Sequence, residues 1–222
     1  MKQFLFSFRN LLFLTFLILS YNVNSQEFIV ASNLNQLYRV DNNLNTTFLF
    51  ELDFFDPNGG NSSIFDIAAK DENTIFAVTG GFGGAFLVEI DLLNESYNIV
   101  DTLPDGQYVG LYYHPDDELY AINNDDLSLY RINPNDGSII EIQDFNQGSP
   151  GDLTFYEGNL IFPGGDLDIY KYDQVNPPVK IGCTEAQFWG FSTFLNSCGE
   201  TTAWGFDILA NIYDYDVESN EF

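Results

Sequence analysis

Carboxylates are the main chemical groups that this sequence offers. Asp and Glu number 33, against 7 Lys and Arg and a single histidine. The chain repeats a strand pattern, which is described below. Alignment of the first strand of each repeat sets four residues in equivalent places: Asp66, Gly110, Asp152 and Gly190. We expect these strands to line one central channel. Ca²⁺ accepts six to eight oxygen ligands, so Asp66 and Asp152 could hold it together with backbone carbonyls. The alternative, which we favour, is that each carboxylate caps a local turn or meets channel water.

Other catalytic groups are few. His114 lies in the sequence Tyr112-Tyr113-His114-Pro115-Asp116-Asp117, which predicts an exposed turn histidine. A Ser-His-Asp or Cys-His arrangement would have to use it, and no Gly-x-Ser-x-Gly pattern accompanies it. We therefore expect no cofactor and favour a protein that is not an enzyme, although the sequence leaves activity open.

Two cysteines, Cys183 and Cys198, raise the question of a disulfide. In an exported protein such a bond could stabilise the fold by about 3 kcal/mol. A strand predicted between them would span roughly 20 Å, whereas bridged Cα atoms lie within about 7 Å. Both possibilities stay open, and we favour a bond made by loops that fold back.

Five copies of a six-residue pattern indicate the architecture that positions these groups. They lie at residues 36–41, 86–91, 128–133, 168–173 and 211–216. Their second residues are Leu37, Leu87, Leu129, Ile169 and Ile212, at steps of 50, 42, 40 and 43 residues. This period is typical of a four-stranded blade. We predict an all-β propeller of antiparallel blades with about five repeats, and helix only in the signal.

The fourth repeat illustrates one expected blade. Runs at residues 151–156, 160–163, 168–173 and 179–182 are separated by Gly, Asn, Asp and Pro clusters, as in an antiparallel meander. The Asx residue that ends each six-residue pattern is placed to bond the backbone of the following turn. These residues are Asp41, Asp91, Asn133, Asp173 and Asp216.

Residues 129–140 carry a resemblance to known proteins. They read Leu-Tyr-Arg-Ile-Asn-Pro-Asn-Asp-Gly-Ser-Ile-Ile and resemble the hairpin of secreted propellers with Leu-Tyr-x-x-Asp-x-x-Thr-Gly repeats, a family that includes quinoprotein-like and YVTN-type proteins. The whole chain resembles the amino-terminal propellers of Bacteroidota surface proteins, which often use type IX secretion. Quinoprotein repeats usually contain a Trp docking motif, which the equivalent strands at 138–143 and 179–182 lack, so the resemblance implies the fold without a quinone.

The first residues predict export. Lys2 and Arg9 precede an apolar run at residues 11–19, and residues 23–25 suit a signal peptidase. We predict a signal peptide at 1–25 and a secreted or cell-surface propeller at 26–222. No transmembrane segment is expected, because a span needs roughly 20 apolar residues. The net charge of −26 argues against nucleic acid, whose phosphates need clustered Lys and Arg.

Two functions fit this sequence. The first is a non-catalytic extracellular recognition, adhesion or scaffold module that binds a glycan, a protein or another domain of a longer polypeptide. Tyr112, Tyr113, Trp189 and Trp204 are candidate contacts, because Tyr and Trp supply rigid amphipathic area, although such residues often pack between blades. The alternative is a metal-assisted hydrolase or lyase that uses channel carboxylates such as Asp66 and Asp152.

The first and last repeats each predict three strands. The first has runs at 28–32, 36–41 and 47–52 and lacks the innermost strand; the last has runs at 189–195, 202–206 and 211–216 and lacks the fourth. We therefore expect an incomplete ring, which results from a truncated reading frame or from a deliberately shortened chain. Its two open blade faces would promote oligomers or aggregates.

Overall fold

Short alternating runs bounded by turn residues form strands throughout the structure, a computed structural model. It describes residues 28–32, 34–41, 45–53, 62–81, 84–104, 106–145, 151–195, 201–207 and 211–215. Within them the strands are β1 (Phe28–Ala31), β2 (Gln36–Val40), β3 (Thr46–Glu51), β4 (Ser62–Ala69), β5 (Thr74–Gly81), β6 (Ala85–Asp91), β7 (Ser96–Leu103), β8 (Tyr108–His114), β9 (Glu118–Asn123), β10 (Ser128–Ile132), β11 (Ile139–Asp144), β12 (Thr154–Tyr156), β13 (Asn159–Pro163), β14 (Asp168–Tyr172), β15 (Val179–Cys183), β16 (Phe188–Leu195), β17 (Thr201–Asp207) and β18 (Ile212–Tyr215). No helix in the described part of the chain has the length and hydropathy needed to cross a membrane.

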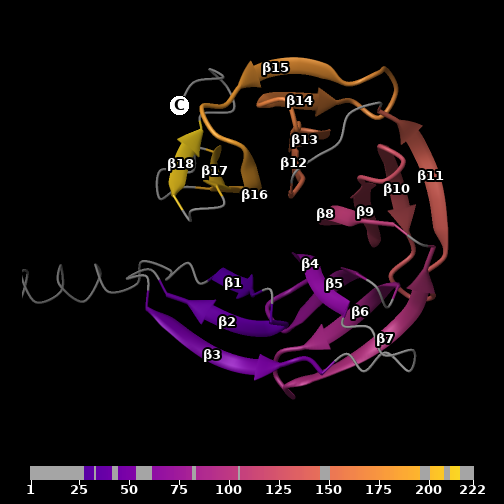
Figure 1. Cartoon of the computed structure of the whole chain (residues 1–222), viewed down its shortest axis with the longest axis vertical. Coiled ribbons are helices and arrows are strands. Elements are labelled where there is room, and N and C mark those ends of the chain that lie inside the picture. The colour runs from indigo at the N-terminus through magenta and orange to yellow at the C-terminus, as the bar shows by residue number, and fades with distance from the viewer. Residues whose placement is uncertain are drawn as a thin grey trace, which may run out of the picture.

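The strands form five antiparallel sheets around one centre, which is a five-bladed β-propeller (Figure 1). Blade 1 is β1–β3, blade 2 is β4–β7, blade 3 is β8–β11, blade 4 is β12–β15 and blade 5 is β16–β18. The predicted fold class is confirmed. Blades 1 and 5 have three strands each among the described residues, at the runs that the sequence indicated.

The repeated leucine or isoleucine anchors each blade to its neighbours. Leu37, Leu87, Leu129 and Ile169 are all fully buried. Each belongs to a different hydrophobic cluster, and the four clusters join consecutive blades from blade 1 to blade 5. Burial of one such side chain stabilises a fold by about 2 kcal/mol. Among the described residues no hydrophobic cluster joins blade 5 to blade 1.

A β-bulge follows the anchor in each of the first four blades and changes the alternation of the outer strand. The pairing register shifts between the anchor and the next residue, and the partner strand gains one unpaired residue. The extra residues are Leu49, Val100, Ile142 and Ile181, each packed against a cluster between two blades. The bulge thus turns one more apolar side chain of the edge strand inward.

The innermost strands β4, β8, β12 and β16 lie nearest the middle of the ring (Figure 1). Bulges interrupt β4 between Ile64 and Asp66, β8 between Val109 and Leu111, and β16 between Phe188 and Gly190. Bulges bend a strand and redirect its side chains. Here they occur where the blades meet at the centre.

Candidate functional site

Asp66 on β4 reaches from blade 2 to blade 3. Its Oδ2 accepts the backbone N–H of Leu111 at 2.5 Å, and its Oδ1 accepts the N–H of Ile67 at 2.7 Å. The N–H of Gly110 also bonds to this carboxyl group. Because Leu111 lies on β8, the side chain ties the two innermost strands together.

Asp152 makes the same arrangement between blades 4 and 5. Its Oδ1 accepts the N–H of Leu153 at 2.8 Å, and its Oδ2 accepts the N–H of Phe191 on β16 at 3.4 Å. Thr154 adds a second link, because its Oγ1 lies 2.6 Å from the Oγ1 of Thr193. Blades 2 and 4 therefore supply carboxylates, and blades 3 and 5 supply backbone donors.

The two carboxyl groups lie near each other at the ring centre, close enough for each to affect the pKa of the other. Burial raises the pKa of Asp66 from 3.8 to about 6, against the opposing effect of its backbone donors. Burial and then the neighbouring charge of Asp66 raise the pKa of Asp152 well above its usual value. Both residues keep intermediate solvent exposure, but the protein around them solvates negative charge poorly, which raises the pKa of each carboxyl group.

Gly110 allows blades 3 and 4 to approach each other between these carboxylates. Its φ is +73°, and a Cβ there would lie 3.2 Å from the carbonyl carbon of Asp152 and 3.3 Å from the oxygen of Gly151. The four aligned residues therefore all lie at or next to these contacts. Asp66 and Asp152 accept the N–H groups, and each aligned glycine comes directly before a donor residue. Gly190 directly precedes Phe191, as Gly110 precedes Leu111.

The same pair would hold a hard cation if one bound here. All four carboxylate oxygens already accept backbone N–H groups. No group of three or more His, Cys, Asp or Glu side chains suited to a metal ion occurs within the described ranges. A Ca²⁺ ion at Asp66 and Asp152, the alternative that the sequence analysis did not favour, stays untested.

His114 is buried, with 9% of its surface exposed, so the prediction of an exposed turn histidine is wrong. Its ring packs edge-on against Phe155 of blade 4, with ring centroids 4.4 Å apart, and against Tyr120 at 5.6 Å. Its Nδ1 accepts the N–H of Asp116 at 3.2 Å. The histidine therefore helps to pack blade 3 against blade 4.

The aromatic candidates are packed to different degrees. Tyr112 stacks on Phe155 at 5.9 Å between ring centroids, and Tyr113 stacks on Phe76 of blade 2 at 5.7 Å. Trp204, on β17, has intermediate exposure. The side chain of Trp189 lies outside the described part of the structure. Binding roles for these four residues stay predictions.

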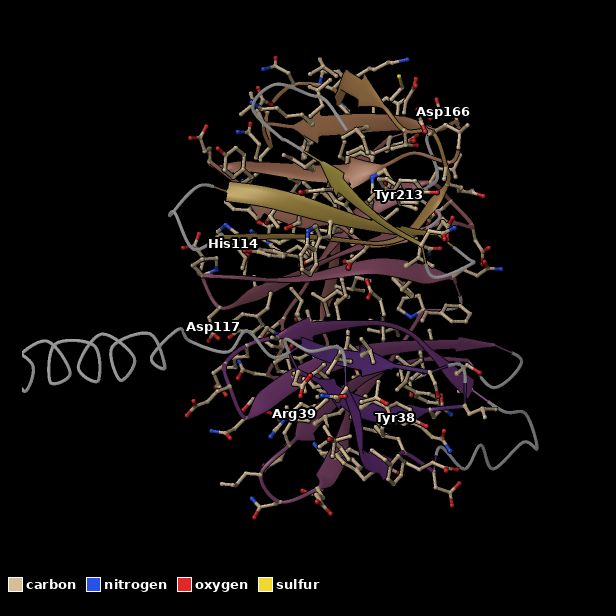
Figure 2. The ribbon with its side chains drawn as sticks, turned by 90° about the vertical axis from the view of Figure 1, so that its left-hand side faces the viewer. Tyr38, Arg39, His114, Asp117, Asp166 and Tyr213 are labelled. Atoms are coloured by element: carbon tan, nitrogen blue, oxygen red, sulfur yellow. The ribbon has the colours of Figure 1, made fainter. Side chains whose placement is uncertain are left out.

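Asp117 and Lys70 contact Tyr113 at the rim of the ring that carries the turn between β8 and β9. The Tyr113 hydroxyl donates to Asp117, while the Lys70 Nζ lies 3.7 Å from the Asp117 carboxylate and 5.6 Å from the Tyr113 ring centroid. Figure 2 shows His114 and Asp117 toward this rim and Asp166 toward the opposite one. Lys70 belongs to the turn between β4 and β5, so the group links blades 2 and 3.

Two turns on this Asp117 rim have the same geometry. Asp91 accepts the N–H groups of Leu93 and Asn94 at 2.9 and 3.0 Å. Asp173 accepts those of Val175 and Asn176 at 2.9 and 2.7 Å, which lowers its pKa to about 2. The predicted Asx turns are thus confirmed at both positions.

The tips of these turns carry exposed aliphatic residues that sequence reasoning missed. Leu93 is 74% exposed and Val175 is 81% exposed. Both stand two residues after the Asp, in the patterns Asp-Leu-Leu-Asn and Asp-Gln-Val-Asn. An apolar residue between two turn-forming polar residues was the available signal.

Cys183 is exposed at the end of β15. Cys198 lies outside the described residues, as does the predicted signal peptide. The disulfide therefore stays a prediction.

Comparison with known proteins extends the fold assignment. The sequence matches no protein-family model and no curated protein. Among solved structures, a protein of unknown function from Bacteroides caccae matches with a TM-score of 0.57 and 12% identity, over 89% of this chain and 70% of that one. The structure of a nidogen/laminin complex matches with a TM-score of 0.58 and 14% identity, over 88% and 78%.

An extracellular domain from B. thetaiotaomicron matches with a TM-score of 0.51 and 18% identity, over 85% of this chain and 26% of that chain. Enzymes are among the other matches, including a virginiamycin B lyase from Staphylococcus aureus. These identities show the fold alone. Propellers host unrelated functions on one scaffold.

Proposed function

We propose that this chain is an extracellular recognition or scaffold module that binds its partner without chemical change. The observation that carries the proposal is the use of Asp66 and Asp152 in bonds between blades. Carboxylates that accept backbone N–H groups across blades contribute to the architecture, and His114 contributes to packing. Asp66, Asp152 and His114 thus have structural partners.

Binding would take place at the Asp117 rim. Asx bonds fix the backbone of its turns before a partner arrives, and a preorganised surface loses less entropy on binding. Leu93 and Val175 present apolar area at the tips, and polar turn residues surround them. Such a surface suits a glycan or a protein of the cell surface, or another domain of a longer polypeptide.

Paired variants at the two rims test this proposal. The purified chain is screened on a printed glycan array and on intact bacterial cells. Binding should fall at least tenfold in the double variant Leu93→Asp, Val175→Asp. Leu34→Asp is the matched control, because Leu34 is 65% exposed in the turn between β1 and β2 on the opposite rim.

Mass spectrometry of the recovered glycans completes the experiment. The proposal predicts that they return unaltered. Cleavage that Asp66→Asn or Asp152→Asn abolishes would contradict it and assign the ring centre to catalysis. Equal loss of binding in the Leu34→Asp control would contradict the assignment of the rim.

A further inference from the structure

One edge of β1 faces the centre of the ring. Among the described residues β1 pairs with β2 alone, whereas the second strand of each other blade lies between two strands. Those strands are β5, β9, β13 and β17. Figure 1 shows β1 on the side of blade 1 that is nearest the middle of the ring. The described part of blade 1 therefore has no counterpart of the inner strands β4, β8, β12 and β16.

The backbone of β1 directs its hydrogen-bonding groups alternately to its two edges. The N–H of Ser32 donates to the oxygen of Gln36 at 2.9 Å. Because antiparallel pairing alternates, Val30 also bonds to β2, and the N–H and C=O groups of Ile29 and Ala31 point to the inner edge. No strand within the described ranges pairs with that edge.

Blade 2 shows what pairs with such an edge. Val78 and Phe76 on β5 correspond to Ala31 and Ile29, because Val78 and Ala31 both lie opposite the anchor of their blade. Both β5 residues pair with the innermost strand β4. The equivalent partner of β1 is an eight-residue extended segment such as β4.

The same edge adjoins apolar surface that the other blades cover. Val30 is 42% exposed. The residues at the same position of the next three blades, Ala77, Ala121 and Phe162, are 0% or 1% exposed and belong to clusters between blades. An added strand would place its side chains beside Val30 on this face.

Two sources within this chain are unsuited to provide the strand. In blades 2 to 5 the innermost strand comes directly before the second strand in the sequence. Residues 1–25, which precede β1, are the predicted signal peptide, and export would remove them. The inner strands of a second copy are already paired in their own sheets, and two copies with a net charge of −26 each repel one another.

We propose that the inner edge of β1 binds an extended segment of another polypeptide, which completes blade 1 as its innermost strand. The segment has seven or eight residues, the lengths of β4, β8 and β16. It is rich in apolar residues and has Asp or Gly at the position of Asp66 and Gly110. Main-chain bonds to Ile29 and Ala31 supply affinity, and contacts with Val30 add specificity. This strand site is separate from the Asp117 rim.

Hydrogen exchange tests the site residue by residue in the chain of residues 26–222. The probe is a synthetic peptide with the sequence of residues 62–69, because β4 is the innermost strand of blade 2. Measured by NMR at saturating peptide, exchange of the Ile29 and Ala31 amides should slow at least tenfold. The amides of Val30 and Phe76, which already bond to neighbouring strands, are the matched controls and should not change.

Two results of this experiment would overturn the proposal. One is unchanged exchange at Ile29 and Ala31 when the peptide is present. The other is slow exchange of these two amides before the peptide is added, because the chain itself or a second copy would then cover the edge.

Proline substitutions test the same contact from both sides. Fluorescence anisotropy of the labelled peptide should show binding at least tenfold weaker to Ala31→Pro, which removes an N–H from the inner edge without removing a bond to β2. Thr46→Pro is the matched control, because the Thr46 N–H lies at the outer edge of β3, and it should bind as the wild-type chain does. The peptide with Ala68→Pro should also bind at least tenfold more weakly to the wild-type chain, which keeps the test decisive if Ala31→Pro does not fold. Equal binding of the two peptides would contradict pairing at this edge.

Discussion

Gly110→Ala should destabilise the ring more than the same substitution at Gly158. Both glycines have a positive φ, +73° and +80°, and an alanine there costs about 1 kcal/mol from the backbone alone. At Gly158 a Cβ meets nothing within 4 Å. At Gly110 it meets three backbone atoms of residues 151–153 at 3.2 to 3.3 Å, and such overpacking typically costs a further 1 to 3 kcal/mol.

The measurement is the free energy of unfolding in urea at about pH 5, which lies below the pKa of about 6 that burial gives Asp66. We expect a loss of about 1 kcal/mol for Gly158→Ala and about 2 to 4 kcal/mol for Gly110→Ala. The difference between the variants isolates the approach of blades 3 and 4. If the two losses agree within about 0.5 kcal/mol, a spread that surface substitutions show, the close contact at the centre is refuted.

Three further predictions concern the rest of the ring. Asn35→Ala should lower the free energy of unfolding by about 2 kcal/mol. The Asn35 side chain donates to the backbone oxygen of Ser62 and accepts the N–H of Ile64, both at 2.8 Å. Unchanged urea unfolding would show that this link between blades 1 and 2 contributes nothing. The thermal unfolding midpoint should be the same in excess chelator and in Ca²⁺, because only a ligand of the native state raises stability, and a reproducible rise with Ca²⁺ would contradict this. Far-ultraviolet circular dichroism of residues 26–222 should show a β spectrum, and a strong helical double minimum would contradict the fold.

The sequence predicted strands and turns well because both depend on local chemistry. The third strand of a complete blade carries the apolar anchor, and its side chains alternate with a period of two. An Asx residue fixes the turn after it. Outer strands were less predictable. Their bulges turn Val100 inward while Ile99 remains 45% exposed, and the position of a bulge depends on the partner strand as well as on the run itself.

The site shows the same limit. Repeat alignment placed Asp66 and Asp152 in equivalent strands, but blades 2 and 4 are not adjacent, and their contact depends on the curvature of the whole ring. The sequence around His114 indicated an exposed turn. The neighbouring blade buries it instead, through Phe155, which is 41 residues away along the chain.

The most direct test of the central claim is a high-resolution crystal structure of the chain grown near pH 5 with Ca²⁺ in the solution. The central claim is that the carboxylates of the ring centre lie near each other and bond to backbone donors. We predict that carboxyl oxygens of Asp66 and Asp152 lie within about 2.5 to 3.0 Å of each other, with the N–H groups of Leu111 and Phe191 directed at them. A cation between the two side chains, with oxygen ligands at about 2.3 to 2.6 Å, would contradict the account and make the ring centre a metal site.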